Sequence, residues 1–318
     1  MIDESDEFSI KWAMEDSEHE ARFKTLDETD LRPFLPFTPG NDLVKIESPT
    51  LAIDSDYPNV HGAFALFPVY AAAVEAVYRD AEINTRLHDL VMGGTSPQAF
   101  NALLDCKADI IFMIAPSDKQ LAEAKERGIE LTITPLGSEA FVFFVSRTNA
   151  VDNLTDRQIR DIYSRKTTIW KDVGGDSQRI MPFQRPEGSG SQTAMERVMD
   201  GTPLTQPVRE EFQVGMGGIV NRVADYRNYG NSIGYSFRYY VEGMFKHDGV
   251  KIISVNGIAP TLENIQSGAY PFIYPIVAVT AGTQNPNAQK LLDWFLSPQG
   301  QDLIRRVGYV PLRENTKP

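Results

Sequence analysis

The sequence predicts an α/β protein. From residue 58 onward, segments with the periodicity of amphipathic helices alternate with short apolar segments typical of strands. Residues 140–145 are strongly apolar, which indicates a strand buried on both faces. The chain has 318 residues, of which 42% are hydrophobic and 23% charged, so it can bury a sizeable core and is long enough for roughly two domains.

The expected strands are short apolar segments, in chain order residues 89–92, 108–114, 131–135, 140–145, 179–183, 232–236 and 273–280. The expected helices are amphipathic, beginning with an alanine-rich one. They cover residues 69–78, about 98–104, 119–128, 156–163, 188–199, 219–224, 287–296 and 298–307. Gly128 is expected to end the third helix, and Thr155 to cap the fourth.

Residues 1–56 differ from the rest of the chain. Acidic residues are dense up to residue 30, and the proline-containing segment 32–40 is typical of extended chain with turns. We expect an N-terminal arm or linker whose charges are solvated. Residues 1–7 are acidic, whereas a signal peptide begins basic and continues apolar. The protein is therefore expected either in the cytoplasm or, as a mature form whose signal peptide has been removed, outside it.

The composition argues against several classes of function. A net charge of −12 opposes binding to nucleic acid, because the phosphates would be repelled. No window of about 18 apolar residues is present, so no membrane span is expected. The single cysteine, Cys106, excludes an internal disulfide, and we expect it half-buried at a helix end. The four histidines show no metal-ligand spacing, so neither a metal nor another cofactor is expected.

Three glycine-rich loops stand directly before predicted helices: residues 93–96, 188–192 and 215–218. A helix N-terminus carries unpaired N–H groups and a partial positive charge, and serine or threonine adds hydroxyl donors. Arg185 precedes the second loop, where its guanidinium can bind an oxyanion in bidentate fashion and Glu187 can orient it. The sequence therefore predicts an oxyanion site at residues 184–192, although any one such loop can also be only a capped helix.

Motifs of common enzymes are not found. The sequence contains no Gly-x-x-x-x-Gly-Lys-Ser/Thr motif of a P-loop, and residues 188–190 lack the spacing of a nucleophile elbow. Neither a nucleophile with a neighbouring base nor a metal pair is apparent, so an enzyme is not expected.

From about residue 57 to its end, the chain resembles the phosphate-binding proteins of bacterial ABC importers. The strongest segment is residues 182–193, Pro-Phe-Gln-Arg-Pro-Glu-Gly-Ser-Gly-Ser-Gln-Thr. Further matching segments follow in the expected order, among them residues 62–70, 94–96, 107–110, 135–141, 153–164, 232–236, 292–301 and 308–312.

The resemblance implies the two-lobed type II periplasmic-binding fold, with two crossover strands at the hinge and residues 1–56 as an extension. One lobe would contain residues 57–137 plus about 271–318, and the other residues 138–270. Proteins of this family capture a dehydrated anion between the lobes by hinge closure and deliver it to an ABC-transporter permease, without covalent chemistry. The expected ligand is inorganic phosphate or a similar oxyanion, bound outside the cytoplasm by a monomer.

The resemblance also implies the ligand-binding residues. In the second lobe the family places an arginine and a Ser-Gly-Thr/Ser helix start, and in the first lobe a hydroxyl before a helix and a loop after the first strand. These features correspond to Arg185, Ser189, Gly190 and Ser191, and to Thr95, Ser96, Phe64 and Ala65.

Two departures from the family keep a second function open. Phe64 stands where the family has threonine, and residues 111–116 lack the aspartate that accepts a hydrogen bond from protonated phosphate and repels fully ionised anions such as sulfate; Asp118 lies just beyond. The chain is thus expected to capture phosphate or a related oxyanion for uptake. Alternatively, it has lost phosphate transport and acts as a sensor or interaction module, or binds another ligand.

Overall fold

The computed structural model describes residues 30–79, 90–208, 211, 216–225 and 230–312. The chain divides into two compact units. Among the described residues, unit 1 contains residues 30–138 and 275–312, and unit 2 contains residues 139–274. Both boundaries fall within strands, β4 (Thr132–Ser146) and β10 (Ile273–Thr280), so the chain passes from one unit to the other along two strands.

Unit 1 is built on strands in the order β2–β1–β3–β10. The strand β1 (Val60–Ala63) lies between β2 (Val91–Gly94) and β3 (Ile110–Ile114) and runs parallel to both. The strand β10 is antiparallel to β3, and β11 (Val310–Pro311) pairs with the first part of β4. The carboxyl ends of β1, β2 and β3 therefore lie at one edge of the sheet.

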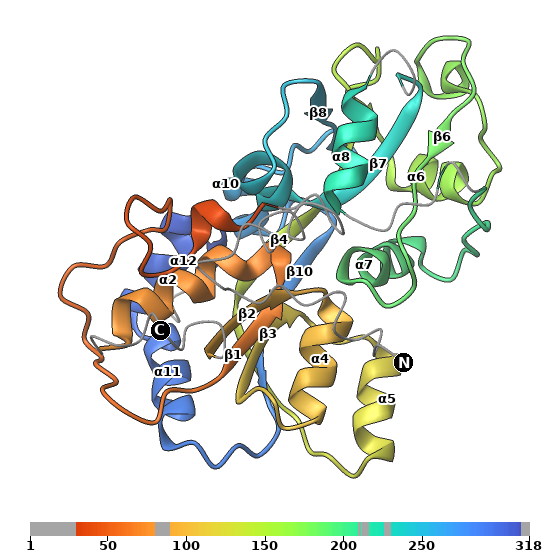
Figure 1. Ribbon diagram of the computed structural model, residues 1–318. Helices are drawn as coiled ribbons and strands as arrows, with labels where there is room; N and C mark the ends of the chain where they lie inside the picture. The colour runs from red at the N-terminus through yellow and green to blue at the C-terminus, as the bar shows by residue number, and fades with distance from the viewer. Residues whose placement is uncertain (1–29, 80–89, 209–210, 212–215, 226–229, 313–318) are drawn as a thin grey trace, which may run out of the picture. The chain divides into compact units, whose positions relative to one another are not determined.

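Helices cover both faces of these strands, with α2 and α4 on opposite sides of β1 to β3 in Figure 1. Side chains alternate along β3: Ile111 and Met113 belong to the apolar cluster of α4, whereas Phe112 stacks on Tyr70 of α2 with ring centroids 5.2 Å apart. The helical segments of unit 1 are η1 (Arg32–Phe34), η2 (Phe64–Leu66), α2 (Phe67–Val77), α4 (Ser96–Leu104), α5 (Asp118–Glu126), α11 (Pro286–Leu296) and α12 (Pro298–Val307).

Unit 2 contains a second set of paired strands. The strand β7 (Ser232–Phe237) is antiparallel to the second part of β4 and parallel to β6 (Met181–Pro182). The strand β8 (Val250–Ile252) pairs with β4, while β5 (Asn153–Leu154) and β9 (Ser254–Val255) form a parallel pair. The helical segments of unit 2 are α6 (Asp156–Tyr163), η3 (Trp170–Val173), α7 (Gly190–Met199), α8 (Met216–Ala224), the π-helix η5 (Tyr240–Met244) and α10 (Leu262–Ser267).

An aromatic cluster forms the core of unit 2. Phe141, Phe143, Tyr163 and Tyr235 are all fully buried. The ring of Tyr235 lies 5.3 Å from that of Phe141 and 5.7 Å from that of Tyr163, measured between centroids. These contacts fix the ring of Tyr235 beneath the segment that precedes α7.

The two strands predicted at residues 131–135 and 140–145 form one strand, β4. Gly137, which lies between the two predicted segments, pairs with Pro311, and an added Cβ would lie 2.5 Å from the carbonyl oxygen of Val310. The glycine is thus required by the close approach of β11 and not by a turn. Cys106, expected to be half-buried, is exposed.

Replacement of Phe112 by alanine is expected to lower the free energy of unfolding by about 3–5 kcal/mol, because Phe112 is 1% exposed and packs against Tyr70 and Phe295. Urea denaturation measures the change. Leu121→Ala, at a side chain 40% exposed, serves as the control and should cost less than about 1 kcal/mol. Equal losses in the two variants would contradict this description of the core.

Candidate functional site

The segment that leads into α7 is fixed before the helix begins. Phe183 donates its N–H to the carbonyl of Ile233 at 3.0 Å, which extends the pairing of β6 with β7. Gln184 donates its backbone N–H to the carbonyl of Glu211 and its side-chain amide to the carbonyl of Thr205, both at 2.8 Å. Hydrogen bonds of Phe183 and Gln184 therefore fix the backbone directly before Arg185.

A tight turn connects Arg185 to the helix. Gly188 has φ +81°, a left-handed conformation that favours glycine. The N–H of Ser189 donates to the carbonyl of Pro186 at 3.2 Å, and Ser189 then takes the extended conformation of an N-cap. The N–H of Thr193 donates to the carbonyl of Ser189 at 2.9 Å, which is the first hydrogen bond of α7.

The first turn of α7 presents donors that the helix itself cannot satisfy. The hydroxyl of Ser189 accepts from the N–H of Gln192 at 3.3 Å. The N–H groups of Gly190 and Ser191 have no acceptor within the helix, and none among the described residues, so they can serve an external one. Ser191 is only 2% exposed, and its Oγ has no hydrogen-bond partner among the residues that the structure describes. A buried hydroxyl without a partner costs about 1–3 kcal/mol, and a bound anion would remove that cost.

Arg185 is 5% exposed, and its backbone is anchored directly to the helix and to β7. Its N–H donates to Oε1 of Gln192 at 3.1 Å and to the hydroxyl of Tyr235 at 3.0 Å. Burial raises the pKa of Tyr235 well above its ordinary value, so the hydroxyl keeps its proton and donates it to Oε1 of Gln192. Glu187, expected to orient the guanidinium, is exposed.

The four predicted residues of unit 1 follow the same edge of its sheet. Phe64 and Ala65 begin η2 directly after β1, while Thr95 and Ser96 begin α4 directly after β2. The two strands are parallel, and their last residues are paired in register, so the two pairs are brought together. Ser117, which caps α5 after the parallel strand β3, is a hydroxyl residue near this edge that our sequence analysis missed.

The hydroxyl of Thr95 is already engaged. It accepts from the N–H of Gln98 at 3.4 Å and donates to Oε1 of Gln98 at 3.0 Å, forming a capping box. Phe64 is 4% exposed, and the carbonyl of Ala65 accepts a hydrogen bond from the hydroxyl of Tyr309. Asp118 is exposed at the start of α5.

The third predicted loop differs from the prediction. Gly217 and Gly218 lie inside α8 instead of preceding it, and Gly215 lies outside the described residues.

Within the part of the chain that the structure describes, no cluster of His, Cys, Asp and Glu could hold a metal ion. None of the helices in that part combines the length and the apolar character needed to cross a membrane.

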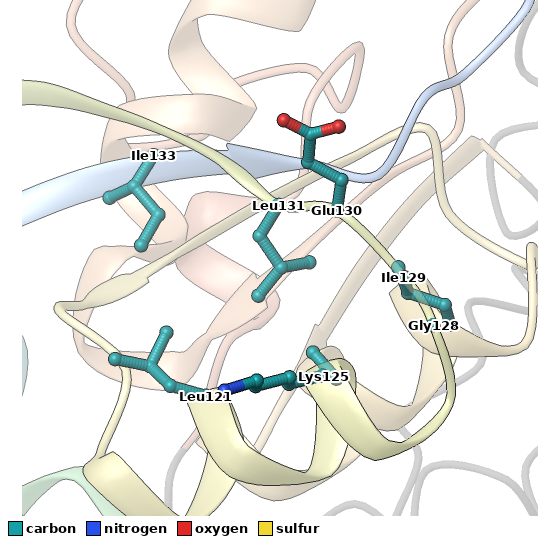
Figure 2. A pocket seen from close by; sticks show the side chains of 8 residues that line it. Leu121, Lys125, Gly128, Ile129, Glu130, Leu131 and Ile133 are labelled. Atoms are coloured by element: carbon teal, nitrogen blue, oxygen red, sulfur yellow. The ribbon is translucent and has the colours of Figure 1, made fainter.

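A groove of about 410 Å³ lies between α5 and the start of β4, and Figure 2 shows its lining side chains. Leu121, Leu131 and Ile133 make it mostly apolar, with Lys125 and Glu130 contributing opposite charges. None of its lining residues is a predicted ligand-binding residue. One lysine and one glutamate give the lining no net positive charge for an anion, so we assign the groove no ligand.

The fold is that of a binding protein, with two α/β units connected by two strands. A family model described as a PBP superfamily domain matches residues 53–299, and the chain therefore belongs to this superfamily. The prediction of the fold class is thereby confirmed.

The relatives of the chain include proteins named phosphate-binding protein PstS, which confirms the resemblance drawn from its sequence. The chain is 26% identical to the phosphate-binding protein PstS of Borreliella burgdorferi over 64% of this chain and 74% of that protein. It is 24% identical to protein SphX of Synechococcus elongatus, over 79% of this chain and 76% of that protein. A crystal structure of a putative phosphate ABC transporter substrate-binding protein with bound phosphate, from Clostridium perfringens, superposes with a TM-score of 0.63 and 25% identity, covering 80% of this chain and 98% of the other.

A buried carboxylate lies where β4 enters unit 2. Glu139 is 1% exposed and accepts hydrogen bonds from the N–H groups of Ala140 at 2.7 Å and Tyr239 at 3.1 Å. The Nε of Arg238 lies 3.6 Å from its Oε1. Burial raises the pKa of Glu139 to about 7, although Arg238 and the two N–H donors oppose the rise.

The free energy of unfolding should fall as the pH rises. Glu139 has a pKa of about 7 in the folded protein and about 4.5 in the unfolded chain, so the unfolded chain releases the proton at a lower pH. The stabilisation is fully present below pH 4.5 and is lost as the pH passes 7, by on the order of 3 kcal/mol. Urea titrations between pH 4.5 and 8 should show this slope for the wild type and not for Glu139→Gln.

His61 affects the same profile with the opposite sign. Burial and the charge of Lys107 lower its pKa to about 4, so stability falls as the pH drops from 6.5 towards 4. This contribution is common to the wild type and Glu139→Gln, and it cancels in their difference. Parallel profiles for the two proteins would contradict the assignment to Glu139.

Proposed function

We propose that the protein is a solute-binding protein that captures phosphate, or a related oxyanion, at the N-terminus of α7. The ligand contacts would be the guanidinium of Arg185, the hydroxyls of Ser189 and Ser191, and the N–H groups of Gly190 and Ser191. The observation that carries the proposal is the Ser191 hydroxyl, which is buried and has no partner among the described residues at a helix start. The site offers three kinds of donor to one anion, a guanidinium, hydroxyls and backbone N–H groups, and no covalent step is required.

The relatives support the ligand and the partner. The relative from Borreliella burgdorferi is named a phosphate-binding protein, and the solved structure from Clostridium perfringens is described as a substrate-binding protein of a phosphate ABC transporter. We therefore propose that this chain delivers its ligand to an ABC-transporter permease, that it acts outside the cytoplasm as a monomer, and that it catalyses no reaction.

A local arrangement of donors suits this chain. The net charge is −12, so the overall field repels anions, and attraction has to come from groups close to the ligand. A helix N-terminus and one buried arginine provide such attraction over a few ångströms. Thr95, Ser96, Phe64 and Ala65 are proposed as further contacts, and Thr95 can donate its proton only if its hydrogen bond to Gln98 opens.

A second candidate is a protein of the same fold that binds another ligand and does not transport phosphate. It is favoured by the apolar character of unit 1 where phosphate binders have polar groups: Phe64 is buried, and residues 111–116 contain no carboxylate. Calorimetric titration with phosphate, sulfate, arsenate and molybdate separates the candidates. Binding of none of the four would favour the second candidate.

Replacement of Arg185 by alanine is expected to weaken phosphate binding by about tenfold to a hundredfold, because one charged hydrogen-bonding group is worth about 1.5–3 kcal/mol. Isothermal titration calorimetry measures the change. Arg157→Ala is a matched control, since it removes the same charge from a side chain that is 88% exposed in unit 2. An unchanged affinity in Arg185→Ala, or an equal loss in both variants, would overturn the proposed site.

Replacement of Ser191 by alanine should affect stability and binding in opposite directions. It removes a buried hydroxyl without a partner, so the ligand-free variant is expected to be more stable than the wild type by up to about 1 kcal/mol. The same change removes a donor to the anion and should weaken phosphate binding about tenfold. Thermal unfolding without ligand and calorimetry with phosphate test both, and a loss of stability without ligand would show that the hydroxyl has a structural role.

A further inference from the structure

Four helices in the described part of the chain begin with the same pattern, a serine or threonine followed three residues later by glutamine. In α4, α5 and α6 the glutamine side chain returns to its own N-cap residue. Its Oε1 accepts the N–H of that residue at 2.8–2.9 Å and the hydroxyl proton at 3.0–3.2 Å, in the pairs Thr95 with Gln98, Ser117 with Gln120, and Thr155 with Gln158. These are complete capping boxes in which the hydroxyl proton is used.

The helix α7 carries the same pattern but a different arrangement. Oε1 of Gln192 does not return to Ser189; it accepts the N–H of Arg185 at 3.1 Å and the hydroxyl proton of Tyr235. The N–H of Ser189 donates instead to the carbonyl of Pro186. The glutamine that elsewhere completes a cap is here bound to the segment before the helix.

This difference changes what Ser189 can do. A carbonyl oxygen has two lone pairs, and those of Gln192 are used by Arg185 and Tyr235. The hydroxyl of Ser189 still accepts the N–H of Gln192, but its proton finds no acceptor among the residues that the structure describes. The proton therefore remains available to a ligand.

Tyr235 is well placed to hold this arrangement. Its ring is fully buried in the aromatic cluster of unit 2, with Phe141 and Tyr163 less than 6 Å away between centroids, so its hydroxyl position is fixed by packing. That hydroxyl both donates to Gln192 and accepts from the N–H of Arg185, and it closes a three-membered network.

We propose that Tyr235 and Gln192 are positioning residues that convert the capped start of α7 into an anion site. By holding the side chain of Gln192 on the backbone of Arg185, Tyr235 keeps the Ser189 hydroxyl proton free and fixes the loop that carries the arginine. The inference rests on the proposed function for its ligand and extends it by assigning two residues that do not touch the anion.

The experiment is a double-mutant cycle with inorganic phosphate as the probe. In Tyr235→Phe the ring packing is kept, but Oε1 of Gln192 loses the hydrogen bond from the Tyr235 hydroxyl. It can then accept a hydrogen bond from the Ser189 hydroxyl. We expect Tyr235→Phe and Ser189→Ala each to raise the Kd about tenfold, because each variant takes the Ser189 hydroxyl away from the ligand. The double variant should therefore raise the Kd far less than a hundredfold. Tyr163→Phe is the control: it removes a hydroxyl from the same cluster that does not contact Gln192, and the Kd should not change.

A crystal structure of Tyr235→Phe gives a readout that needs no ligand. We expect Oε1 of Gln192 within hydrogen-bond distance of the Ser189 hydroxyl, as in the capping boxes of α4, α5 and α6. If Gln192 stays on the N–H of Arg185, or if the two single effects on the Kd are additive, the positioning role is overturned. If Arg185→Ala leaves phosphate binding unchanged, the proposed function itself fails, and the crystal structure still decides the arrangement of Gln192.

Discussion

The pairing of β6 with β7 is the interaction on which the rest of the candidate site depends. It places Phe183 beside Ile233, and two residues further along β7 the hydroxyl of Tyr235 reaches the N–H of Arg185. The N-terminus of α7 is thus attached to a buried strand of the sheet and not only to its own loop. In a chain of net charge −12, an anion can be held only by donors that are fixed at short range, because the long-range field is unfavourable.

The same sequence pattern serves two purposes in this protein. At α4, α5 and α6, serine or threonine with glutamine satisfies the helix start completely, and such caps contribute about 1 kcal/mol each to stability. At α7 the donors are left incompletely satisfied, with the Ser191 hydroxyl buried and without a partner among the described residues. A helix start that binds a ligand has to forgo part of this stabilisation, since a donor cannot serve the cap and the ligand at once.

Features that depend on residues close together in the chain were predicted from the sequence. The loop from Arg185 to Gln192 combines glycine, hydroxyls and a charge within eight residues, and the helix behind it begins at Gly190, two residues after the expected start. Features that depend on contacts between residues far apart in the sequence were not predicted. The arrangement of Gln192 is decided by Tyr235, 43 residues away, and the continuity of β4 through Gly137 is decided by its pairing with β11 near the C-terminus. Local propensity carries no information about such contacts.

The donors at α7 also limit how selective this helix start can be on its own. N–H groups and a guanidinium only donate, so they favour any tetrahedral anion, sulfate as well as phosphate. The Ser189 and Ser191 hydroxyls can rotate to accept a hydrogen bond from hydrogen phosphate, but a hydroxyl can equally donate to sulfate and does not reject it. Rejection requires a fixed acceptor such as a carboxylate, which leaves a fully ionised anion facing a like charge. None of the four residues proposed at α7 supplies one, so discrimination between phosphate and sulfate has to come from an acceptor elsewhere in the chain.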